Sequence, residues 1–182
     1  MVRALTIFGV VAALTAAASA QPAVNGGTHE LQANTAGQQI SLEVTGGQAV
    51  QGVEFYAQLP AGDGPCFLAG DLLTGTIFEV NHDQDPNAWG SYVHAHDLYL
   101  GVATNSGTVS AAGKLVTLTL DTTGLWSGTY ALQLRNDVEA AQTNFCGVDA
   151  TLTDGTLTVV PEPGTLLLLA GGAAGLLRRR RR

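Results

Sequence analysis

Basic residues are scarce in the part of the chain where a folded domain is expected. Between residues 21 and 160 only Lys114 and Arg135 are basic, against fourteen carboxylates, so this region carries a net charge of −12. Such a surface repels nucleic acid and anionic lipid and favours solubility outside the cell. We therefore expect no nucleic acid partner.

The sequence also lacks the short motifs of the common enzyme classes. It contains no G-x-S-x-G, H-E-x-x-H, P-loop or dinucleotide-binding fingerprint. Ser91, His94 and Asp97 follow at three-residue spacing, which does not produce triad geometry on a strand. Glu54 and Asp97 resemble a glycosidase pair, but any acidic β domain supplies such pairs. We expect no enzyme and no cofactor.

Cysteine is limited to Cys66 and Cys146, which are not spaced as a CxxC motif. This pattern disfavours zinc and redox sites. An even number of cysteines in an exported chain predicts one disulfide, which would close a loop of about 80 residues and stabilise the fold by ~4–5 kcal/mol. The alternative is two free thiols.

The first twenty residues have the three parts of a secretory signal peptide. Arg3 precedes an apolar run, and small residues lead to a cleavage site between Ala20 and Gln21. The alternative, an uncleaved N-terminal anchor, is disfavoured because the run is short for a membrane span. We expect residues 1–20 to form a signal helix that is removed.

The last segment also has three parts. Pro161 and Pro163 keep the chain extended around Glu162, because proline fixes φ and disfavours a helical residue before it. Residues 166–177 are apolar or small, a helix of only ~18 Å against a hydrocarbon core of ~30 Å. By the positive-inside bias, the chain then stops in the membrane at five arginines: Arg178, Arg179, Arg180, Arg181 and Arg182.

This arrangement resembles the PEP-CTERM protein-sorting signal of Gram-negative bacteria, with Pro161, Glu162 and Pro163 as its signature. The resemblance implies recognition and cleavage by exosortase, a membrane protease-transpeptidase. It also implies a transient stage in the inner membrane, followed by delivery to the cell envelope, outer surface or extracellular matrix. The alternative is a plain C-terminal anchor with a chance Pro-Glu-Pro before it.

Between these signals the apolar residues alternate with polar ones, as in half-buried strands. The alternation covers residues 40–44, 53–59, 78–80, 116–120, 129–134 and 156–159, with turn residues at 46–47, 60–65, 105–107, 126–128 and 154–155. Residues 21–37 have little periodicity, and we expect a leader with one edge strand near residues 29–31. The sequence predicts an all-β, antiparallel β-sandwich over residues 38–160.

The runs at residues 113–120, 127–132 and 154–159 resemble the second half of a cohesin-like domain, and residues 50–59 resemble its second strand. The resemblance implies a jelly-roll sandwich of the kind that binds dockerin modules or carbohydrate-associated partners. No position matches a dockerin-contact motif, so a fold is implied and a binding surface is not.

Two polar clusters are candidates for metal binding. Asn81, Asp83, Asp85 and Asn87 place oxygen ligands at alternate positions, which suits calcium, although the EF-hand spacing of glycine and glutamate is not met. A solvated acidic turn is the alternative. His94 and His96 would point to one face of a strand and begin a metal site, or they are ordinary surface histidines.

Four aromatic residues are candidates for a platform that stacks on sugar rings, or for buried core: Trp89, Tyr92, Tyr99 and Trp126. Taken together, the sequence predicts an exported, non-enzymatic sandwich with a structural or adhesive role in surface or exopolysaccharide biology. Its expected partners are the exosortase-type protease, the secretion machinery, the membrane, and exopolysaccharide or a surface protein. The alternatives are a cohesin-like carbohydrate- or protein-binding module and, third, a secreted hydrolase.

Overall fold

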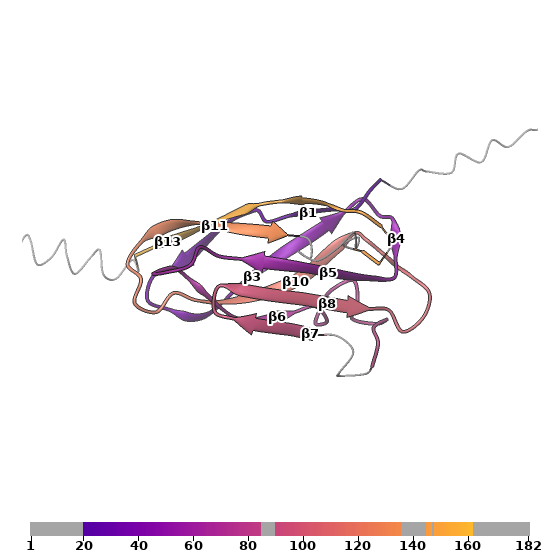
Figure 1. The fold of residues 1–182 in the computed structure, drawn as a ribbon, viewed down its shortest axis with the longest axis horizontal. Helices are drawn as coiled ribbons and strands as arrows, with labels where there is room; N and C mark the ends of the chain where they lie inside the picture. The colour runs from indigo at the N-terminus through magenta and orange to yellow at the C-terminus, as the bar shows by residue number, and fades with distance from the viewer. Residues whose placement is uncertain (1–19, 85–89, 136–144, 147, 162–182) are drawn as a thin grey trace, which may run out of the picture.

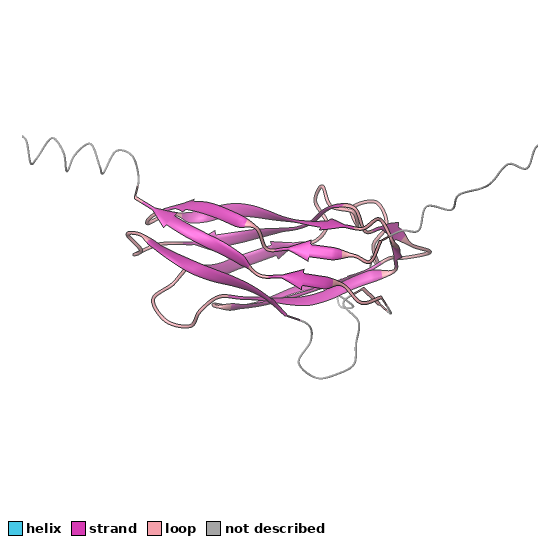
Figure 2. Cartoon of the chain, turned by 90° about the horizontal axis from the view of Figure 1, so that it is seen from above, coloured by secondary structure: helices cyan, strands magenta, loops and turns pink. Residues whose placement is uncertain are grey.

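The structure is a computed structural model that describes residues 20–84, 90–135, 145–146 and 148–161. These residues form strands and loops, and none of them lies in a helix (Figure 2). The two expected terminal helices, at residues 1–20 and 166–177, lie outside the described residues except for Ala20. The all-β prediction is confirmed for the domain.

The strands gather in two main sheets that lie face to face, with a small third sheet at one end (Figure 1). One sheet has the order β12-β1-β3-β10-β6, the other β2-β13-β11-β5-β8-β7, and β4 pairs with β9. In chain order the strands are β1 (Ala23–Asn25), β2 (Thr28–Gln32), β3 (Ala36–Thr45), β4 (Ala49–Val50), β5 (Gly52–Gln58), β6 (Cys66–Asp71), β7 (Gly90–His94), β8 (Asp97–Ala103), β9 (Val109–Ser110), β10 (Gly113–Asp121), β11 (Gly128–Arg135), β12 (Thr151–Thr153) and β13 (Gly155–Val160).

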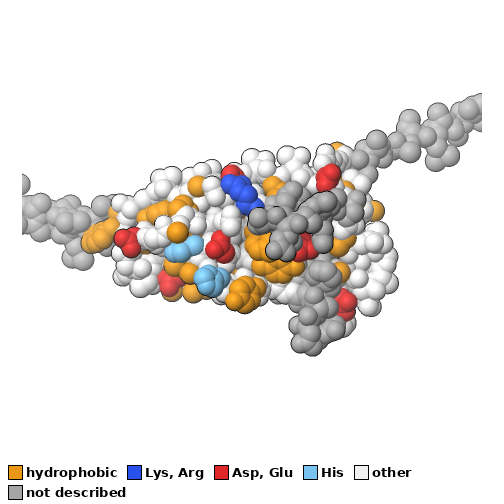
Figure 3. Space-filling model, in the orientation of Figure 1, with side chains coloured by type: hydrophobic (Ala, Val, Ile, Leu, Met, Phe, Trp, Pro, Cys, Tyr) orange, Lys and Arg blue, Asp and Glu red, His pale blue; other side chains and the backbone are white. Residues whose placement is uncertain are grey.

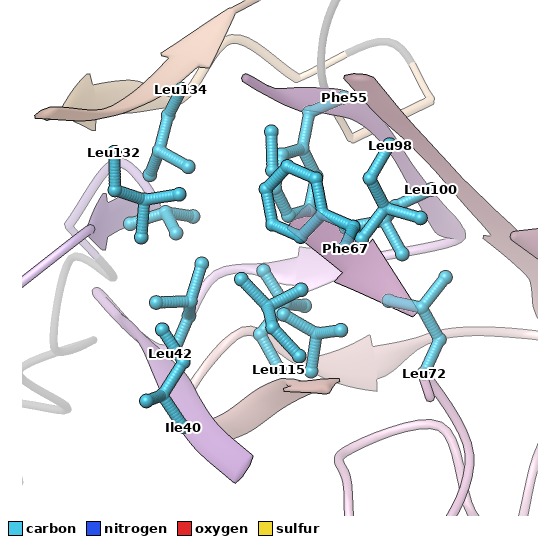
Figure 4. Close-up of a cluster of buried hydrophobic side chains, with 14 of the residues drawn as sticks. Ile40, Leu42, Phe55, Phe67, Leu72, Leu98, Leu100, Leu115, Leu132 and Leu134 are labelled. Atoms are coloured by element: carbon cyan, nitrogen blue, oxygen red, sulfur yellow. The ribbon is translucent and has the colours of Figure 1, made fainter. Parts of the chain in front are cut away.

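The core lies between the two main sheets. Phe55, Leu98 and Leu100 of the larger sheet face Leu42 and Leu115 of the smaller one, and all five side chains are buried (Figure 4). Leu115 lies at a β-bulge between Lys114 and Val116, and the other four are inward members of period-two strands. Burying such a side chain contributes ~1.5–3 kcal/mol. The alternation predicted for β3, β5, β10, β11 and β13 is confirmed.

The first segment of the domain (β1 and β2) and the last (β12 and β13) run side by side in the same direction. Each passes from one sheet to the other at the same point along the sandwich. β1 pairs with β12 in one sheet, and β2 pairs with β13 in the other, each pair in parallel register. The crossings are at Gly26 and Gly155, whose backbones lie in contact. The sandwich was expected to be antiparallel throughout, but the two pairs formed by its first and last segments are parallel.

The segment expected to be a leader belongs to the sandwich. The edge strand expected near residues 29–31 is present as β2, but β1 and the start of β3 also lie within residues 21–37. Val24 and Leu31 are buried and hold this segment in the core. The packed domain thus begins at β1 rather than at residue 38.

Residues 78–80 were wrongly predicted to be a strand. They form turns, with Phe78 buried in the core and Val80 93% exposed. Thr76 fixes the turn, because its Oγ1 lies 3.1 Å from the carbonyl of Leu73 and accepts the N–H of Phe78. A single buried aromatic side chain followed by a valine imitates strand periodicity without forming a strand.

Candidate binding face

Three tyrosines form a row across neighbouring strands of the larger sheet. Tyr56 of β5 lies directly opposite Tyr99 of β8, and Tyr99 lies directly opposite Tyr92 of β7. All three have the parity opposite to the buried residues of their strands, so they point outward. We call the outer surface of β11, β5, β8 and β7 the tyrosine face.

The rings are held at different degrees of exposure. The ring centroids of Tyr56 and Tyr99 are 5.2 Å apart with the planes tilted by 55°, a favourable geometry for an aromatic pair. The hydroxyl of Tyr99 donates to Glu54 Oε1 at 3.0 Å, which fixes that ring. Tyr92, on the edge strand, is 69% exposed. The row thus combines two fixed rings with one that is open to a partner.

Polar groups flank the row on both sides. Gln58 Nε2 donates to Asp97 Oδ1 at 2.9 Å, and His94 stands opposite Asp97 in the register. Arg135 stands opposite Tyr56 in the register. Figure 3 views the molecule from this side, with hydrophobic groups among acidic, basic and histidine side chains. The face offers aromatic rings beside hydrogen-bond donors and acceptors.

Arg135 is tied down by an ion pair. Its Nη1 lies 2.8 Å from Asp154 Oδ1, and the same oxygen accepts the backbone N–H of Leu134 at 2.9 Å. The Leu134 hydrogen bond, followed by that from Arg135, lowers the pKa of Asp154 below its ordinary value. The guanidinium is therefore held at the border of the tyrosine face.

The expected aromatic platform is only partly assembled. Tyr92 and Tyr99 do lie side by side, but Trp126 lies on a loop at the end of the sandwich and Trp89 falls outside the described residues. Tyr56 was not among the candidates. Its outward parity is visible in the sequence, but its alignment with Tyr99 depends on the register of β5 and β8, which a single sequence does not specify.

The two candidate histidines do not share the face of one strand. His94 ends β7, and His96 lies in the two-residue turn before β8, where Ala95 has a positive φ of 48°. His96 Nδ1 instead approaches the carbonyl of Pro65 at 3.2 Å. Within the part of the chain that the structure describes, no cluster of three or more His, Cys, Asp or Glu side chains is arranged to hold a metal.

The hydrolase candidates are likewise dispersed. Ser91 stands opposite Leu100, whereas His94 stands opposite Asp97 at the far end of β7. Glu54 accepts the Tyr99 hydroxyl, and Asp97 accepts the Gln58 amide four residues along β5. Neither the serine set nor the carboxylate pair is brought together around a shared point.

The calcium candidates are divided between described and undescribed residues. Asn81 binds the backbone of Ser106, donating to its carbonyl at 2.8 Å and accepting its N–H at 3.4 Å. Asp83 donates its backbone N–H to Ala103. Asp85 and Asn87 lie outside the described residues. Asn81 thus serves as a link between two loops.

A cavity of about 390 Å³ lies beside this loop, between β6, β7 and β8. Its lining includes Asp71, His82, Asp83 and Ser91. Burial opposes ionisation of Asp71, but hydrogen bonds from Thr74 and Leu73 and the charge of Lys114 outweigh it and lower the pKa. The Asp71 carboxylate therefore caps the turn after β6.

The predicted disulfide between Cys66 and Cys146 is absent, and both cysteines are free thiols. Cys66 lies at the end of the sandwich where β5 stops, since the next residue, Phe67, donates to Ala95 at 2.7 Å. The Cys146 thiol lies beside Gly52, where β5 begins. β5 has seven residues, so about 20 Å separates these ends, whereas a disulfide needs Cα atoms within ~7 Å.

Cys146 occupies an unusual site next to the larger sheet. It has a positive φ of 41°, and burial, reinforced by the charge of Glu54, raises the pKa of its thiol. Both effects disfavour the thiolate. The Cys146 thiol is therefore a weak nucleophile at neutral pH.

Of the sorting signature only Pro161 is described, directly after β13; Glu162, Pro163 and the five arginines Arg178 to Arg182 lie outside the described residues. Where the structure describes the chain, it contains no apolar helix of membrane-spanning length. Residues 159–182 match the family described as PEP-CTERM protein-sorting motif. The chain ends in a PEP-CTERM motif. This motif implies export and cell-surface sorting through an exosortase.

The PEP-CTERM chain resembles solved cohesins in its fold. A non-cellulosomal cohesin from the hyperthermophilic archaeon Archaeoglobus fulgidus matches with a TM-score of 0.58 and 17% identity, covering 80% of this chain and 96% of that one. A type I cohesin–dockerin complex from Clostridium thermocellum matches with a TM-score of 0.56 and 12% identity, over 80% and 97% of the two chains. No curated protein matches the chain. The sandwich is cohesin-like.

Proposed function

We propose that this protein is an adhesive component of the bacterial surface or extracellular matrix, delivered by an exosortase-type system. On this proposal the sandwich binds exopolysaccharide through the tyrosine face. The observation that carries the proposal is the row of Tyr56, Tyr99 and Tyr92 on three adjacent strands, with Tyr92 69% exposed. Aromatic faces stack on the apolar faces of sugar rings, and flanking amides and carboxylates bind hydroxyls.

The test is binding of the exported protein to exopolysaccharide isolated from the producing cells. Tyr92→Ala is expected to weaken binding roughly tenfold, equivalent to ~1.4 kcal/mol. Trp126→Ala is the matched control, because it removes an aromatic side chain that is 63% exposed but lies off the tyrosine face. Equal binding by both variants and the parent would reject this face as the binding site.

A second candidate is a binding module for a surface protein. Several solved structures with this fold are described as cohesin–dockerin complexes, which are assemblies of two proteins. Treating the bound fraction separately with protease and with periodate distinguishes the candidates. Loss of binding after proteolysis favours a protein partner, and loss after periodate oxidation favours a glycan.

A further inference from the structure

The described chain enters and leaves the sandwich at opposite ends of its long axis (Figure 1). Ala20 forms a bridge with Gly47, just beyond the C-terminal end of β3. Val160 accepts the backbone N–H of Ala33 at 2.8 Å, just before β3 begins. β3 has ten residues, so these two points are separated by about 30 Å.

Trp126 lies at the end where the chain leaves. Gly128 pairs with Val159, so the antiparallel register places Trp126 toward Pro161. Trp126 is 63% exposed, although tryptophan is usually largely buried. Trp126 is not among the buried side chains of the core or the apolar side chains packed against it.

The loop that carries Trp126 is held firmly. Thr122 is fully buried, and its Oγ1 lies 2.9 Å from the carbonyl of Thr35 while accepting the side-chain amide of Gln38 at 3.0 Å. Asn34 donates its backbone N–H to Leu125, and its side chain accepts the N–H of Gly124. The ring of Trp126 is thus presented from a fixed turn.

The loops at the same end carry little charge. These loops, residues 33–35, 60–65, 95–96 and 122–127, contain one carboxylate, Asp63, in a domain of net charge −12. Figure 3 shows exposed hydrophobic surface at this end of the molecule. Asp97 and Asp121 also lie at this end, at the start of β8 and the end of β10, so it is not free of acidic groups. Tryptophan is enriched at the interface of a bilayer, and an exposed indole beside loops with a single carboxylate suits that environment.

The length of the connecting chain brings this end to the membrane. Four residues lie between Pro161 and the first apolar residue of the tail, Leu166, so the five Cα–Cα steps span at most ~17 Å when extended. We propose that, while the tail is still attached, the sandwich docks on the membrane through this end, with Trp126 in the headgroup layer. This rests on the proposed membrane stage of sorting.

The test uses the full chain in bilayers of zwitterionic lipid, with Trp89→Phe so that Trp126 is the only tryptophan. Its emission is expected to shift to the blue and to be quenched more by lipids brominated near the headgroup than by lipids brominated near the chain end. The control is Asn105→Trp with Trp89→Phe and Trp126→Phe. Asn105 is exposed beyond β8, at the opposite end of the sandwich, so its reporter is expected to escape quenching.

Flotation with the vesicles separates failure of this inference from failure of the proposed sorting. A chain that does not float would show that the tail does not insert, which overturns both. A chain that floats with Trp126 no more quenched than the Asn105→Trp reporter overturns the docking alone. Shielding of Trp126 that appears only at a high number of chains per vesicle and is lost on dilution with excess lipid would assign this end to a second copy of the chain, and would also overturn the docking.

Discussion

Gly26 and Gly155 lie in backbone contact where the first and last segments of the sandwich change sheets. A Cβ on Gly155 would lie 2.7 Å from the carbonyl oxygen of Gly27, and one on Gly26 would lie 2.8 Å from the Cα of Gly155. The opposing atoms are backbone, so no side chain can rotate away to make room. Only glycine allows the two segments to cross.

Gly155→Ala is therefore expected to destabilise the domain by about 3 kcal/mol, the upper range for overpacking a rigid site. Denaturant unfolding of the mature protein measures the loss. Gly90→Ala is the matched control, because a Cβ there meets nothing within 4 Å and φ is not positive. Equal stability of the two variants would show that the crossing can relax.

The separation of Cys66 and Cys146 predicts two free thiols in the exported protein. Alkylation under denaturing, non-reducing conditions is expected to modify both, and Cys66→Ser with Cys146→Ser should leave stability nearly unchanged. An intact disulfide closing a loop of this size would instead be worth ~4–5 kcal/mol. Recovery of a peptide cross-linked between the two cysteines would contradict the fold around β5.

The Asp154 carboxylate predicts a small pH dependence of stability. Its pKa is lowered in the folded state, so its contribution is present above the ordinary aspartate value and is lost as the pH falls through the folded value. Asp154→Asn is expected to lower the free energy of unfolding at neutral pH by less than ~1 kcal/mol, because the ion pair is nearly half exposed.

Between about pH 5 and pH 3 the difference between Asp154→Asn and the parent should shrink. Asp63→Asn, on an exposed loop, controls for the loss of one negative charge. A difference that stayed constant over this pH range would assign the effect to packing instead of ionisation.

The PEP-CTERM segment predicts two distinct sorting defects. Replacing Arg178 to Arg182 with glutamine removes charges that cost ~2.5–3.5 kcal/mol each at the bilayer centre, so the chain should be released uncut. Replacing Pro161 and Pro163 with alanine lets a helix extend back from the apolar segment, so the chain should remain uncut in the inner membrane. Cell fractionation and mass analysis of the C-terminus distinguish the two outcomes; normal trimming of both variants would reduce the tail to an anchor.

Sequence periodicity predicted the strands that bury alternate residues and failed where burial is irregular. β6 buries Phe67 but leaves the next apolar residue, Leu68, 47% exposed, so apolar and polar residues do not alternate along it. The sequence therefore did not predict this strand. Phe78 imitated a strand from within a turn. Strand existence is encoded locally, but edge strands and turns with one buried ring depend on what packs against them.

The candidate sites were harder to predict, because they depend on alignment between strands. The outward parity of Tyr56, Tyr92 and Tyr99 follows from the sequence, whereas their common row requires the registers of three strands. The predicted disulfide was wrong for a similar reason, because an even number of cysteines does not specify how far apart the fold places them. The sorting segment was predictable since its three parts are contiguous in the chain.

The parallel terminal strands also determine when this domain finishes folding. Ala23 pairs with Thr151 and Gln32 pairs with Val160, so contacts from the start of the domain wait for residues more than a hundred positions later. Such long-range pairing closes slowly. During export β1 and β2 emerge first. β1 lacks its neighbour on one side until β12 arrives, and β2, an edge strand, has no paired strand until β13 arrives. Since β13 ends at Val160 and Pro161 follows, the sandwich can close only after the chain has been exported as far as the sorting motif.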